Sequence, residues 1–154
     1  MTIIDLMHEP QHIPILAAWH HQEWAHLNPG ASLEKRIQKM QAYLSDEWLP
    51  STYICKRGGQ LIGSAAVVAC DMDSRPELTP WLASVCVAPT FRCQGVGSKL
   101  VQHAMHQARQ VGVGKLFLFT PDQERFYQAL GWTTIAEEIY RDCSVKVMQA
   151  VLND

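Results

Sequence analysis

The residues from Arg92 to Ser98 carry the most informative chemistry in the sequence. They read R-C-Q-G-V-G-S and place two glycines, Gly95 and Gly97, just before a predicted helix. Glycine allows positive φ and close backbone approach. The first-turn N–H groups of a helix have no internal partners and lie at the positive end of its dipole. Such a turn can bind a phosphate group, and Arg92 adds a permanent cation beside it.

Several phosphate-binding patterns compete for this turn. A Walker A loop needs GxxxxGK[ST], which the sequence lacks. A dinucleotide fingerprint needs a third glycine, whereas Gly97 is followed by S-K-L. The pattern R-x-x-G-x-G, preceded by a predicted strand and by V-x-P at Val87–Pro89, fits a third family better. A nucleotide-binding turn and a glycine-rich helix start without a ligand are the alternatives.

The stretch Val85–Gly97, together with the later phrase F-Y-Q-A-L-G-W at 126–132, resembles the GNAT superfamily of acetyl-CoA-dependent N-acetyltransferases. Members carry a Q/R-x-x-G-x-G/A loop and, after a helix and a strand, a helix that commonly ends in F-Y-x-x-L-G-F. The resemblance covers about residues 51–150. It departs from the usual pattern at Thr120, which stands roughly in the place of an asparagine. The resemblance implies an enzyme that moves the acetyl group of acetyl-CoA to a primary amine of a small acceptor or peptide N-terminus. A non-catalytic acyl-CoA-binding or regulatory module on the same fold is the alternative.

The resemblance also implies which residues contact acetyl-CoA. The loop binds the pyrophosphate through backbone N–H groups, and the free edge of the strand at Val85–Val87 pairs with the pantetheine arm. A backbone N–H at the same place stabilises the oxyanion of the reacting thioester. The expected contact residues are Val85, Cys86, Val87, Arg92, Cys93, Gln94, Gly95, Val96, Gly97, Ser98 and Thr120. Tyr127 matches the tyrosine near the sulfur, where a phenol can protonate the departing thiolate. Packing against CoA is its alternative role.

The acceptor side is the part that the sequence specifies least. By the resemblance, the first two helices form one wall of the acceptor site. The candidate lining residues are His20, Glu23 and Trp24 on the first helix, with Trp81 and Tyr140 from the opposite side. Burial of the tryptophans in the core is the alternative, because their spacing also suits an apolar helix face. An acidic and aromatic pocket of this composition would suit a cationic amine.

A base must remove a proton from the acceptor amine, and the strand that often carries a glutamate in the family offers no carboxylate here, since it reads W-L-A-S at 81–84. The candidates are Glu77, Asp71, Asp73, Glu23 and His20. A water chain to one of them is a further possibility.

The cysteines and histidines indicate neither a disulfide framework nor a metal site. The five cysteines form no C-x-x-C pair, and no H-E-x-x-H pattern occurs. We therefore expect free thiols in a reducing cytoplasm and no bound metal. Direct transfer needs no nucleophilic cysteine, although an acyl-enzyme on Cys86 or Cys93 is an alternative.

Apolar spacing and turn residues predict the elements that position these groups. Helices are expected over 10–27 and 33–44, the first ended by Asn28-Pro29-Gly30 and the second capped by Ser32. The later elements are expected as strands 51–56 and 61–70 joined by a hairpin turn, strand 81–87, helix 98–111, strand 115–119, helix 123–130, and strands 132–135 and 143–151. The β-α-β unit from 82 to 119 predicts two neighbouring parallel strands.

The predicted fold is therefore a single α/β (α+β) domain over residues 1–154. From the resemblance we expect a mixed, mostly antiparallel central sheet with a splayed parallel strand pair, flanked by about four helices. The 154 residues are 47% hydrophobic and 18% charged, which excludes intrinsic disorder.

The charge balance limits the partners. A net charge of -2 provides no broad basic surface for nucleic acid or an anionic membrane. No apolar run approaches the ~18 residues of a membrane helix, and Met1–Asp5 lacks the features of a signal peptide. We expect a cytoplasmic protein with no nucleic-acid or membrane partner. Exposed edge strands near the C-terminus would permit a homodimer.

Overall fold

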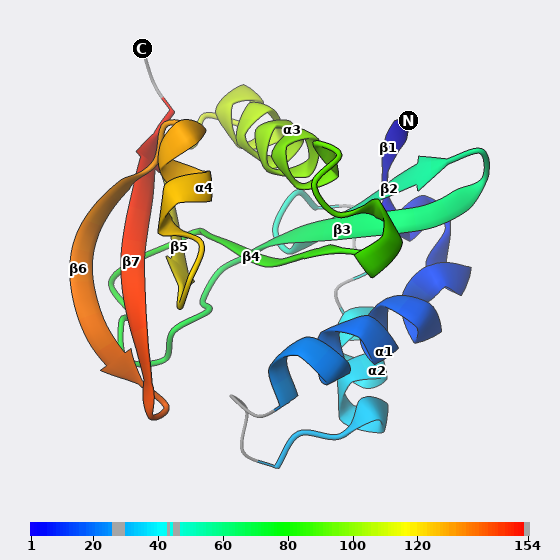
Figure 1. The fold of residues 1–154 in the computed structure, drawn as a ribbon, viewed down its shortest axis with the longest axis horizontal. Coiled ribbons are helices and arrows are strands. Elements are labelled where there is room, and N and C mark those ends of the chain that lie inside the picture. The colour runs from blue at the N-terminus through cyan, green and yellow to red at the C-terminus, as the bar shows by residue number, and fades with distance from the viewer. Residues whose placement is uncertain (26–29, 43, 45–46, 153–154) are drawn as a thin grey trace.

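A seven-stranded sheet forms the centre of the molecule, in the strand order β1-β2-β3-β4-β5-β7-β6 (Figure 1). The structure is a computed structural model that describes residues 1–25, 30–42, 44 and 47–152. The strands are β1 (Thr2–Asp5), β2 (Ser51–Arg57), β3 (Gln60–Val68), β4 (Trp81–Val87), β5 (Lys115–Thr120), β6 (Thr133–Tyr140) and β7 (Cys143–Val151). β4 and β5 run parallel, and every other pair of neighbours in this sheet is antiparallel.

Helices cover both faces of the sheet. The α-helices of the described residues are α1 (Ile13–Trp24), α2 (Leu33–Ala42), α3 (Val96–Gln110) and α4 (Glu124–Ala129). Short 3-10 turns are η1 (Leu6–His8), η2 (Pro10–His12) and η4 (Pro89–Phe91). α3 and α4 lie on one side of the sheet, and α1 and α2 lie on the other (Figure 1). The predicted fold class is confirmed.

Alternation along the strands builds a core on each face. In β5, Leu116 and Leu118 pack with the α3 face, whereas Phe117 packs with the opposite face beside Trp81. The residues of β3 also face both sides, since Ile62 belongs to the core beneath α3 and Ala66 to the core beside Trp81. Burial on both faces explains why these strands read as continuous apolar runs in the sequence.

Most predicted elements are found within a few residues of their expected bounds, and 81–87 and 143–151 are found as predicted. The Ser32 cap is confirmed, because the Lys35 amide donates to Ser32 Oγ at 3.1 Å. The first helix is shorter than predicted: α1 begins at Ile13, after a 3-10 turn. Its predicted end at Leu27 and the turn residues Asn28 and Pro29 lie outside the described residues.

Two strands depart from the sequence prediction. β1 was not predicted, because four residues of mixed exposure carry no clear period. β6 was expected to end at Ile135, yet it continues to Tyr140. Its polar second half stays extended because each residue pairs with β7, as Glu138 does with Val145. Tertiary hydrogen bonding thus extends a strand that has little hydrophobic pattern of its own.

The parallel pair is the feature that opens the sheet. The β4–β5 ladder has a single register pair, Trp81 with Phe117, and the Phe117 amide donates to the Pro80 carbonyl at 3.0 Å. Both strands continue beyond this point without further register pairs between them. Their C-terminal halves therefore diverge, as the resemblance implied, and leave a strand edge of β4 free of β5.

A β-bulge bends β4 at the same place. Ser64 pairs with Cys86 and Ala66 with Ala83, so two β4 residues stand opposite one β3 residue. One of the two, Ser84, has a φ of 56°. Bulges of this kind bend a strand and redirect its side chains. The bulge thus turns the second half of β4 away from β5.

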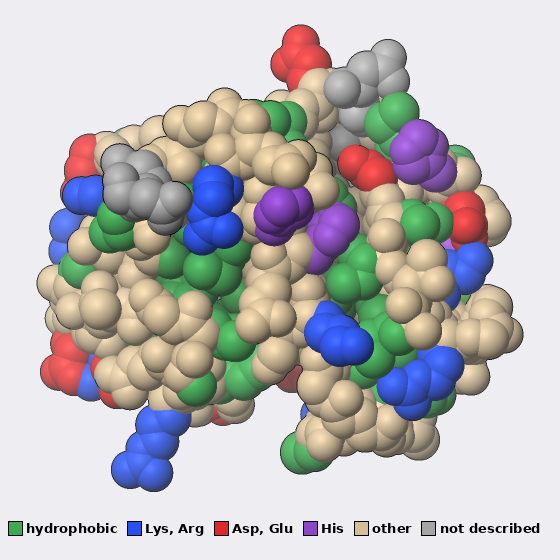
Figure 2. All heavy atoms as spheres, turned by 90° about the horizontal axis from the view of Figure 1, so that it is seen from above, with side chains coloured by type: hydrophobic (Ala, Val, Ile, Leu, Met, Phe, Trp, Pro, Cys, Tyr) green, Lys and Arg blue, Asp and Glu red, His purple; other side chains and the backbone are tan. Residues whose placement is uncertain are grey.

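Figure 2 shows the face that lies uppermost in Figure 1, above α3. On this face the Lys and Arg side chains are scattered among apolar, polar and acidic ones, with no single basic patch. Within the described part of the chain, no helix is long and apolar enough to cross a lipid bilayer.

Candidate functional site

A cavity of about 820 Å³ lies where β4 and β5 diverge. At one end it is lined by the loop before α3. At the other end it is lined by residues of α2, the β3–β4 loop and the tip of the β6–β7 hairpin. Between these ends, the diverging halves of β4 and β5 and one face of α4 complete the wall. The cavity therefore connects the glycine-rich turn to side chains that are distant in the sequence.

The loop end of the cavity is lined by residues around the start of α3. α3 begins at Val96, and its N-cap Gly95 has a φ of 82°. Cys93 is also left-handed, with a φ of 62°. Gly95, Val96, Gly97 and Ser98 all line the cavity. A 15-residue helix that begins here presents its unpaired first-turn N–H groups and the positive end of its dipole, which favours an anion.

Arg92 connects this loop to two other elements. Its Nε donates to the Val87 carbonyl at 3.1 Å, and its Nη2 donates to Glu23 Oε1 at 2.9 Å. The guanidinium thus lies on the cavity wall between the end of β4 and the end of α1. Gln94 lies differently: its Oε1 accepts from Arg57 at 3.0 Å, and it is absent from the cavity wall.

Close backbone packing holds the loop in place. A Cβ on Gly97 would lie 3.4 Å from Cζ of Phe126, so α3 starts directly against α4. A Cβ on Gly63 of β3 would lie 3.0 Å from both the Cys86 carbonyl and Leu100 Cδ1. Glycine is needed at Gly63 because α3 and β4 both approach the backbone of β3 there.

The free edge of β4 forms the middle of the cavity. Val85, Cys86 and Val87 all line it. Extended backbone without a neighbouring strand can pair with the amides of an elongated ligand. Burial, with a smaller effect of Glu23, raises the pKa of the Cys86 thiol to about 11. The thiol is therefore protonated at neutral pH, so it is a poor nucleophile.

Tyr127 lines the cavity from α4 and is 9% exposed. Its ring packs edge-on against Phe126 and Trp132, with centroid distances of 5.0 and 6.1 Å. Burial, together with the charge of Asp122, raises the pKa of the phenol to about 12. The phenol thus stays protonated through the physiological range and can act as a proton donor.

Thr120 is buried on the same wall, at the end of β5. Its Oγ1 accepts from the Gln123 amide at 3.0 Å, which closes the turn into α4. Thr120 is the acceptor in this bond, so its own hydroxyl proton can be donated to a ligand in the cavity.

The far end of the cavity is built around Arg36 of α2. Its Nη2 lies 2.6 Å from His20 Nδ1 and donates to Ser84 Oγ at 3.1 Å. A guanidinium always donates, so Nδ1 accepts and the proton of His20 lies on Nε2, which is 3.2 Å from Ser64 Oγ. Burial, strengthened by the charge of Arg36, lowers the pKa of His20 to about 3. His20 is therefore neutral and holds the guanidinium at the wall.

Asp71, in the loop after β3, lines this end and is partly buried. Loss of hydration raises its pKa to about 6, although Lys39, Arg36 and Arg141 each act in the opposite direction. Lys39 also lines the cavity; loss of hydration and the neighbouring Arg36 lower its pKa. The charges of Arg36, Lys39 and Arg141 therefore lie close enough to influence the pKa of Asp71.

The β6–β7 hairpin contributes its tip. Arg141 and Asp142 form the two-residue turn and both have positive φ, 50° and 64°, as a type I′ turn requires. The Tyr140 hydroxyl donates to Asp73 Oδ1 at 3.1 Å, and Arg141 donates to Asp73 Oδ2 at 3.3 Å. The Arg141 guanidinium also lies 4.9 Å from the centre of the Tyr140 ring. These contacts hold the hairpin tip against the β3–β4 loop.

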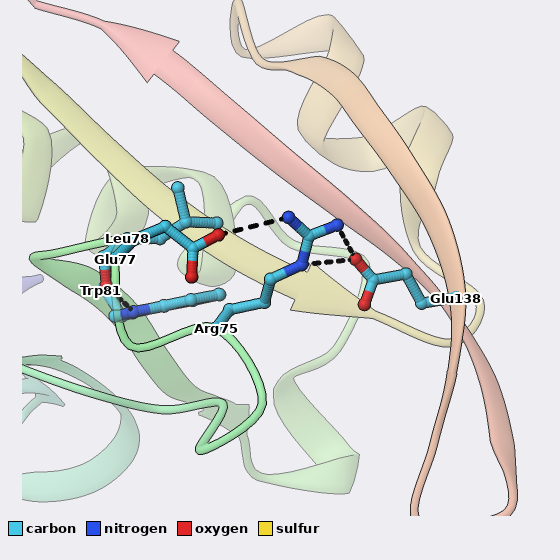
Figure 3. A network of polar contacts seen from close by, with 5 residues as sticks. All are labelled: Arg75, Glu77, Leu78, Trp81 and Glu138. Atoms are coloured by element: carbon cyan, nitrogen blue, oxygen red, sulfur yellow. Dashed lines mark hydrogen bonds and ion pairs between the residues drawn. The ribbon is translucent and has the colours of Figure 1, made fainter.

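A second polar network fixes the same loop further along (Figure 3). Arg75 bonds Glu138 of β6 through two donors and Glu77 at 3.2 Å. Trp81 is fully buried, and its indole N–H donates to the Leu78 carbonyl at 2.6 Å. The dashed lines in Figure 3 join these groups to one another. The network anchors the β3–β4 loop to β4 and to β6.

The cavity brings together most of the site residues expected from the sequence. Ten of the eleven predicted acetyl-CoA contacts line it; the eleventh, Gln94, does not. Tyr127, Glu23 and Trp24 line it too. His20 and Trp81, which were expected on the acceptor side, lie in the packed interior instead. The expected roles of these residues stay predictions.

The far end of the cavity differs in charge from the acidic acceptor pocket that was expected. Arg36, Lys39 and Arg141 line it, with Asp71. None of the three cations was singled out from the sequence. Arg36 and Lys39 are three apart, which places them on one face of α2, yet helical spacing does not say what that face meets. Within the described residues, no group of three or more His, Cys, Asp or Glu side chains is arranged to bind a metal ion.

Comparison with known proteins adds to this geometry. A sequence profile described as "Acetyltransferase (GNAT) family" matches residues 15–132. Similar solved structures include a ribosomal-protein-alanine N-acetyltransferase from Brucella melitensis, with a TM-score of 0.76 at 20% identity over 99% of this chain and 100% of that one. An aminoglycoside 6'-N-acetyltransferase complexed with coenzyme A has a TM-score of 0.77 at 13% identity, over 100% and 98%. The structure of yncA from Salmonella typhimurium with its cofactor acetyl-CoA has a TM-score of 0.72 at 18% identity, over 100% and 95%. At these identities the likeness is one of fold.

Proposed function

The chain belongs to the GNAT family of acetyltransferases, and from that premise we propose that it transfers the acetyl group of acetyl-CoA directly to a primary amine of a small molecule or peptide N-terminus. One observation carries the proposal. One cavity is lined by a helix start of the kind that can bind phosphate, by an open strand edge and by a tyrosine whose raised pKa keeps it protonated. These are the groups needed to bind and cleave an acyl thioester.

Acetyl-CoA would bind along the length of this cavity. The N–H groups at Gly95–Ser98 would hold the pyrophosphate, and Arg92 would add positive charge beside it. The amides of the pantetheine arm would pair with the free edge of β4 at Val85–Val87. Thr120 offers a hydroxyl near the point where β5 ends. This placement would bring the thioester toward Tyr127.

The reaction would proceed in one displacement at the thioester carbon. The neutral amine attacks this carbon and forms the C–N bond, while the carbonyl oxygen gains negative charge. A backbone N–H on the free edge of β4 would stabilise that oxyanion. The C–S bond then breaks with its electron pair on sulfur. Tyr127 would donate a hydrogen bond and then its proton to that sulfur, and solvent would return a proton to the phenol.

Asp71 is the best-supported acceptor of the proton that the amine loses. It lines the cavity, and its pKa of about 6 leaves it ionised at neutral pH. The other candidates are engaged elsewhere: Glu23 with Arg92, Glu77 with Arg75, and Asp73 with Tyr140 and Arg141. His20 is bonded to Arg36, and its low pKa makes it a weak base.

A thioester intermediate on the enzyme is less well supported. Cys86 lines the cavity but its pKa of about 11 keeps it protonated, and Cys93 is exposed. Direct transfer needs neither thiol. All five cysteines are free, which supports a reducing compartment such as the cytoplasm.

The decisive experiment measures CoA release from acetyl-CoA across amines, amino acids, polyamines, aminoglycosides and N-terminal peptides. Turnover with any amine, with the N-acetyl product identified by mass spectrometry, supports the enzyme. Tight CoA binding by calorimetry without turnover would favour the non-catalytic binding module. ATP or NAD binding more tightly than CoA would favour the nucleotide-binding alternative.

We also keep the homodimer as a proposal. β6 is the outermost strand of the sheet, and its Ile135 and Ile139 are 42% and 74% exposed. An exposed edge strand with apolar side chains is a surface through which two copies can pair. Sedimentation velocity would distinguish a dimer from a monomer.

A further inference from the structure

We propose that Arg57 and Gln94 are positioning residues for the loop before α3, and that they raise the affinity for acetyl-CoA from outside the cavity. Neither side chain lines the cavity, although the two are bonded to each other and Gln94 belongs to the loop that does. The inference rests on the proposed function, because it takes this loop to bind the pyrophosphate. It gives Gln94 a role that differs from the direct contact with acetyl-CoA expected from the sequence.

The Gln94 side chain connects Arg57 to the backbone of the loop. Its Oε1 accepts from Arg57 Nη1 at 3.0 Å, and its Nε2 donates to the Thr90 carbonyl at 3.3 Å. The partners define the orientation of this amide, because a guanidinium only donates and a carbonyl only accepts. One amide group thus closes the loop between Thr90 and Gln94 and attaches it to the end of β2.

The backbone around Gln94 is the strained part of the loop. Cys93 and Gly95, on either side of it, are both left-handed, with φ of 62° and 82°. Positive φ at a non-glycine residue costs free energy, and it persists where surrounding contacts fix the backbone. The hydrogen bond from Arg57 is such a contact. It holds the chain directly before the first N–H groups of α3.

Arg57 has a second contact with the same loop. Its Cζ lies 5.7 Å from the centre of the Phe91 ring, within the range of a cation–π interaction. Phe91 lines the cavity and packs against the core beneath α3. Arg57 therefore contacts the loop at two side chains, one before and one after Arg92.

The β2–β3 hairpin is a well-defined support for these contacts. Arg57 is the last residue of β2 and directly precedes the two-residue turn into β3. Gly58 and Gly59 have φ of 57° and 81°, as a type I′ turn requires. β3 also holds the beginning of the loop, since the Ala88 amide donates to the Ile62 carbonyl at 2.8 Å. The hairpin thus orders the loop before a ligand binds, which reduces the conformational cost of binding.

The test is a double-mutant cycle in which calorimetry measures the dissociation constant of CoA. Arg57→Met and Gln94→Met each remove the hydrogen bond, and each should raise this constant about three- to tenfold. The double variant should bind CoA about as weakly as the weaker single variant, because both substitutions break the same connection. Arg57→Lys keeps a cation and a donor and should recover part of the affinity. Unchanged affinity in Arg57→Met, or additive losses in the double variant, would overturn the inference.

A second ligand separates positioning from direct contact. Dephospho-CoA lacks the 3′-phosphate of CoA but keeps the pyrophosphate. If Arg57 acts through the loop, Arg57→Met should weaken the binding of both ligands by the same factor. A loss confined to CoA would show that Arg57 contacts the 3′-phosphate, and it would overturn the inference.

Two control variants come from the same hairpin. Lys56→Met removes the neighbouring cation, which is paired with Glu9, and should leave CoA affinity unchanged. An equal loss in Lys56→Met would attribute the effect to net charge and overturn the inference. Gly58→Ala should also bind CoA as the wild type does. Its φ of 57° is one that an L-residue can adopt, and the added Cβ would meet nothing within 4 Å.

Kinetics keep this inference separate from the proposed function. With an amine that is acetylated, Arg57→Met should raise the KM for acetyl-CoA and leave kcat and the KM for the amine unchanged. A lower kcat at saturating acetyl-CoA would place the effect in the chemical step and overturn the inference while leaving acetyl transfer established. CoA binding without turnover of any amine would overturn the proposed transfer, and the calorimetric cycle would still decide this inference. A wild-type protein that binds no CoA would overturn both.

Discussion

The two ends of the cavity are built in different ways. The loop end is formed by one contiguous segment, where Cys93 and Gly95 adopt positive φ just before α3 and the first residues of α3 line the cavity. The far end depends on charged side chains, among them Arg36 and Arg141, that the fold brings together from distant parts of the chain. Backbone chemistry is shared by many sequences with the right turn, whereas side-chain chemistry changes with each substitution. The far end of the cavity should therefore be more sensitive to a change of side chain than the loop end.

The largest effect is expected at the point where the two ends meet. Tyr127→Phe should lower kcat by about 10²- to 10⁴-fold, the usual contribution of a general acid. The CoA dissociation constant should change little, because the ring still packs against Phe126 and Trp132. Stopped-flow kinetics and calorimetry measure the two quantities. An unchanged kcat would reassign Tyr127 to packing.

The second-largest effect is expected for a substitution of Asp71, and it should leave CoA binding at the loop end unchanged. Asp71→Asn should lower kcat/KM by about 10²-fold without affecting CoA binding. In the wild type, kcat/KM should rise as the pH passes upward through the Asp71 pKa of about 6, because the ionised form accepts the proton. That acidic limb should be missing from the variant. A limb of the same shape in both proteins would exclude Asp71 as the base.

The same variant should lose activity without losing stability. Because the pKa of Asp71 is raised from 3.8 in the folded protein, folding favours its protonated form. Its contribution to stability is thus most favourable below pH 3.8 and is lost as the pH rises through about 6. At pH 7, Asp71→Asn should be as stable as the wild type or more stable by on the order of 1 kcal/mol. Urea unfolding at pH 4 and pH 7 tests this sign.

Gly63→Ala tests the packing beneath the loop end. The added Cβ would lie 3.0 Å from the Cys86 carbonyl and from Leu100 Cδ1, so β3, β4 and α3 must move apart. We expect a loss of about 1–3 kcal/mol in the free energy of unfolding. Urea titration measures it, and an unchanged midpoint would show that the contact relaxes without cost.

Gly95→Ala tests whether the loop binds through its backbone. Its φ of 82° is unfavourable for alanine by roughly 1–2 kcal/mol, so the start of α3 should shift. CoA affinity should then fall about tenfold. Gly58→Ala is the matched control, because Gly58 is left-handed at 57° and lies in the β2–β3 turn away from the cavity. Equal CoA affinity in the two variants would contradict a backbone-built phosphate site.

Prediction from sequence succeeded where the signal is local. The strand Trp81–Val87 and the hairpin turn before Gln60 are found at their predicted places. Apolar runs and glycine pairs indicate the conformation of the backbone in which they occur. It failed for the second half of β6, which pairing with β7 holds extended. At the site, ten of the eleven proposed acetyl-CoA contacts line the cavity, since they belong to one motif and its neighbours.

The sequence by itself determined the family, the fold class and the segment proposed to bind acetyl-CoA, because contiguous residues set the turn and the helix start. Only the tertiary structure decided which side chains the far end of the cavity contains. Arg36 and Arg141 are more than a hundred positions apart, and no pattern in either segment indicates that the two side chains lie near one cavity. They line one cavity because β4 diverges from β5 and the β6–β7 hairpin is anchored on the loop after β3. Charge complementarity depends on distance in space, so it emerges when the chain is folded.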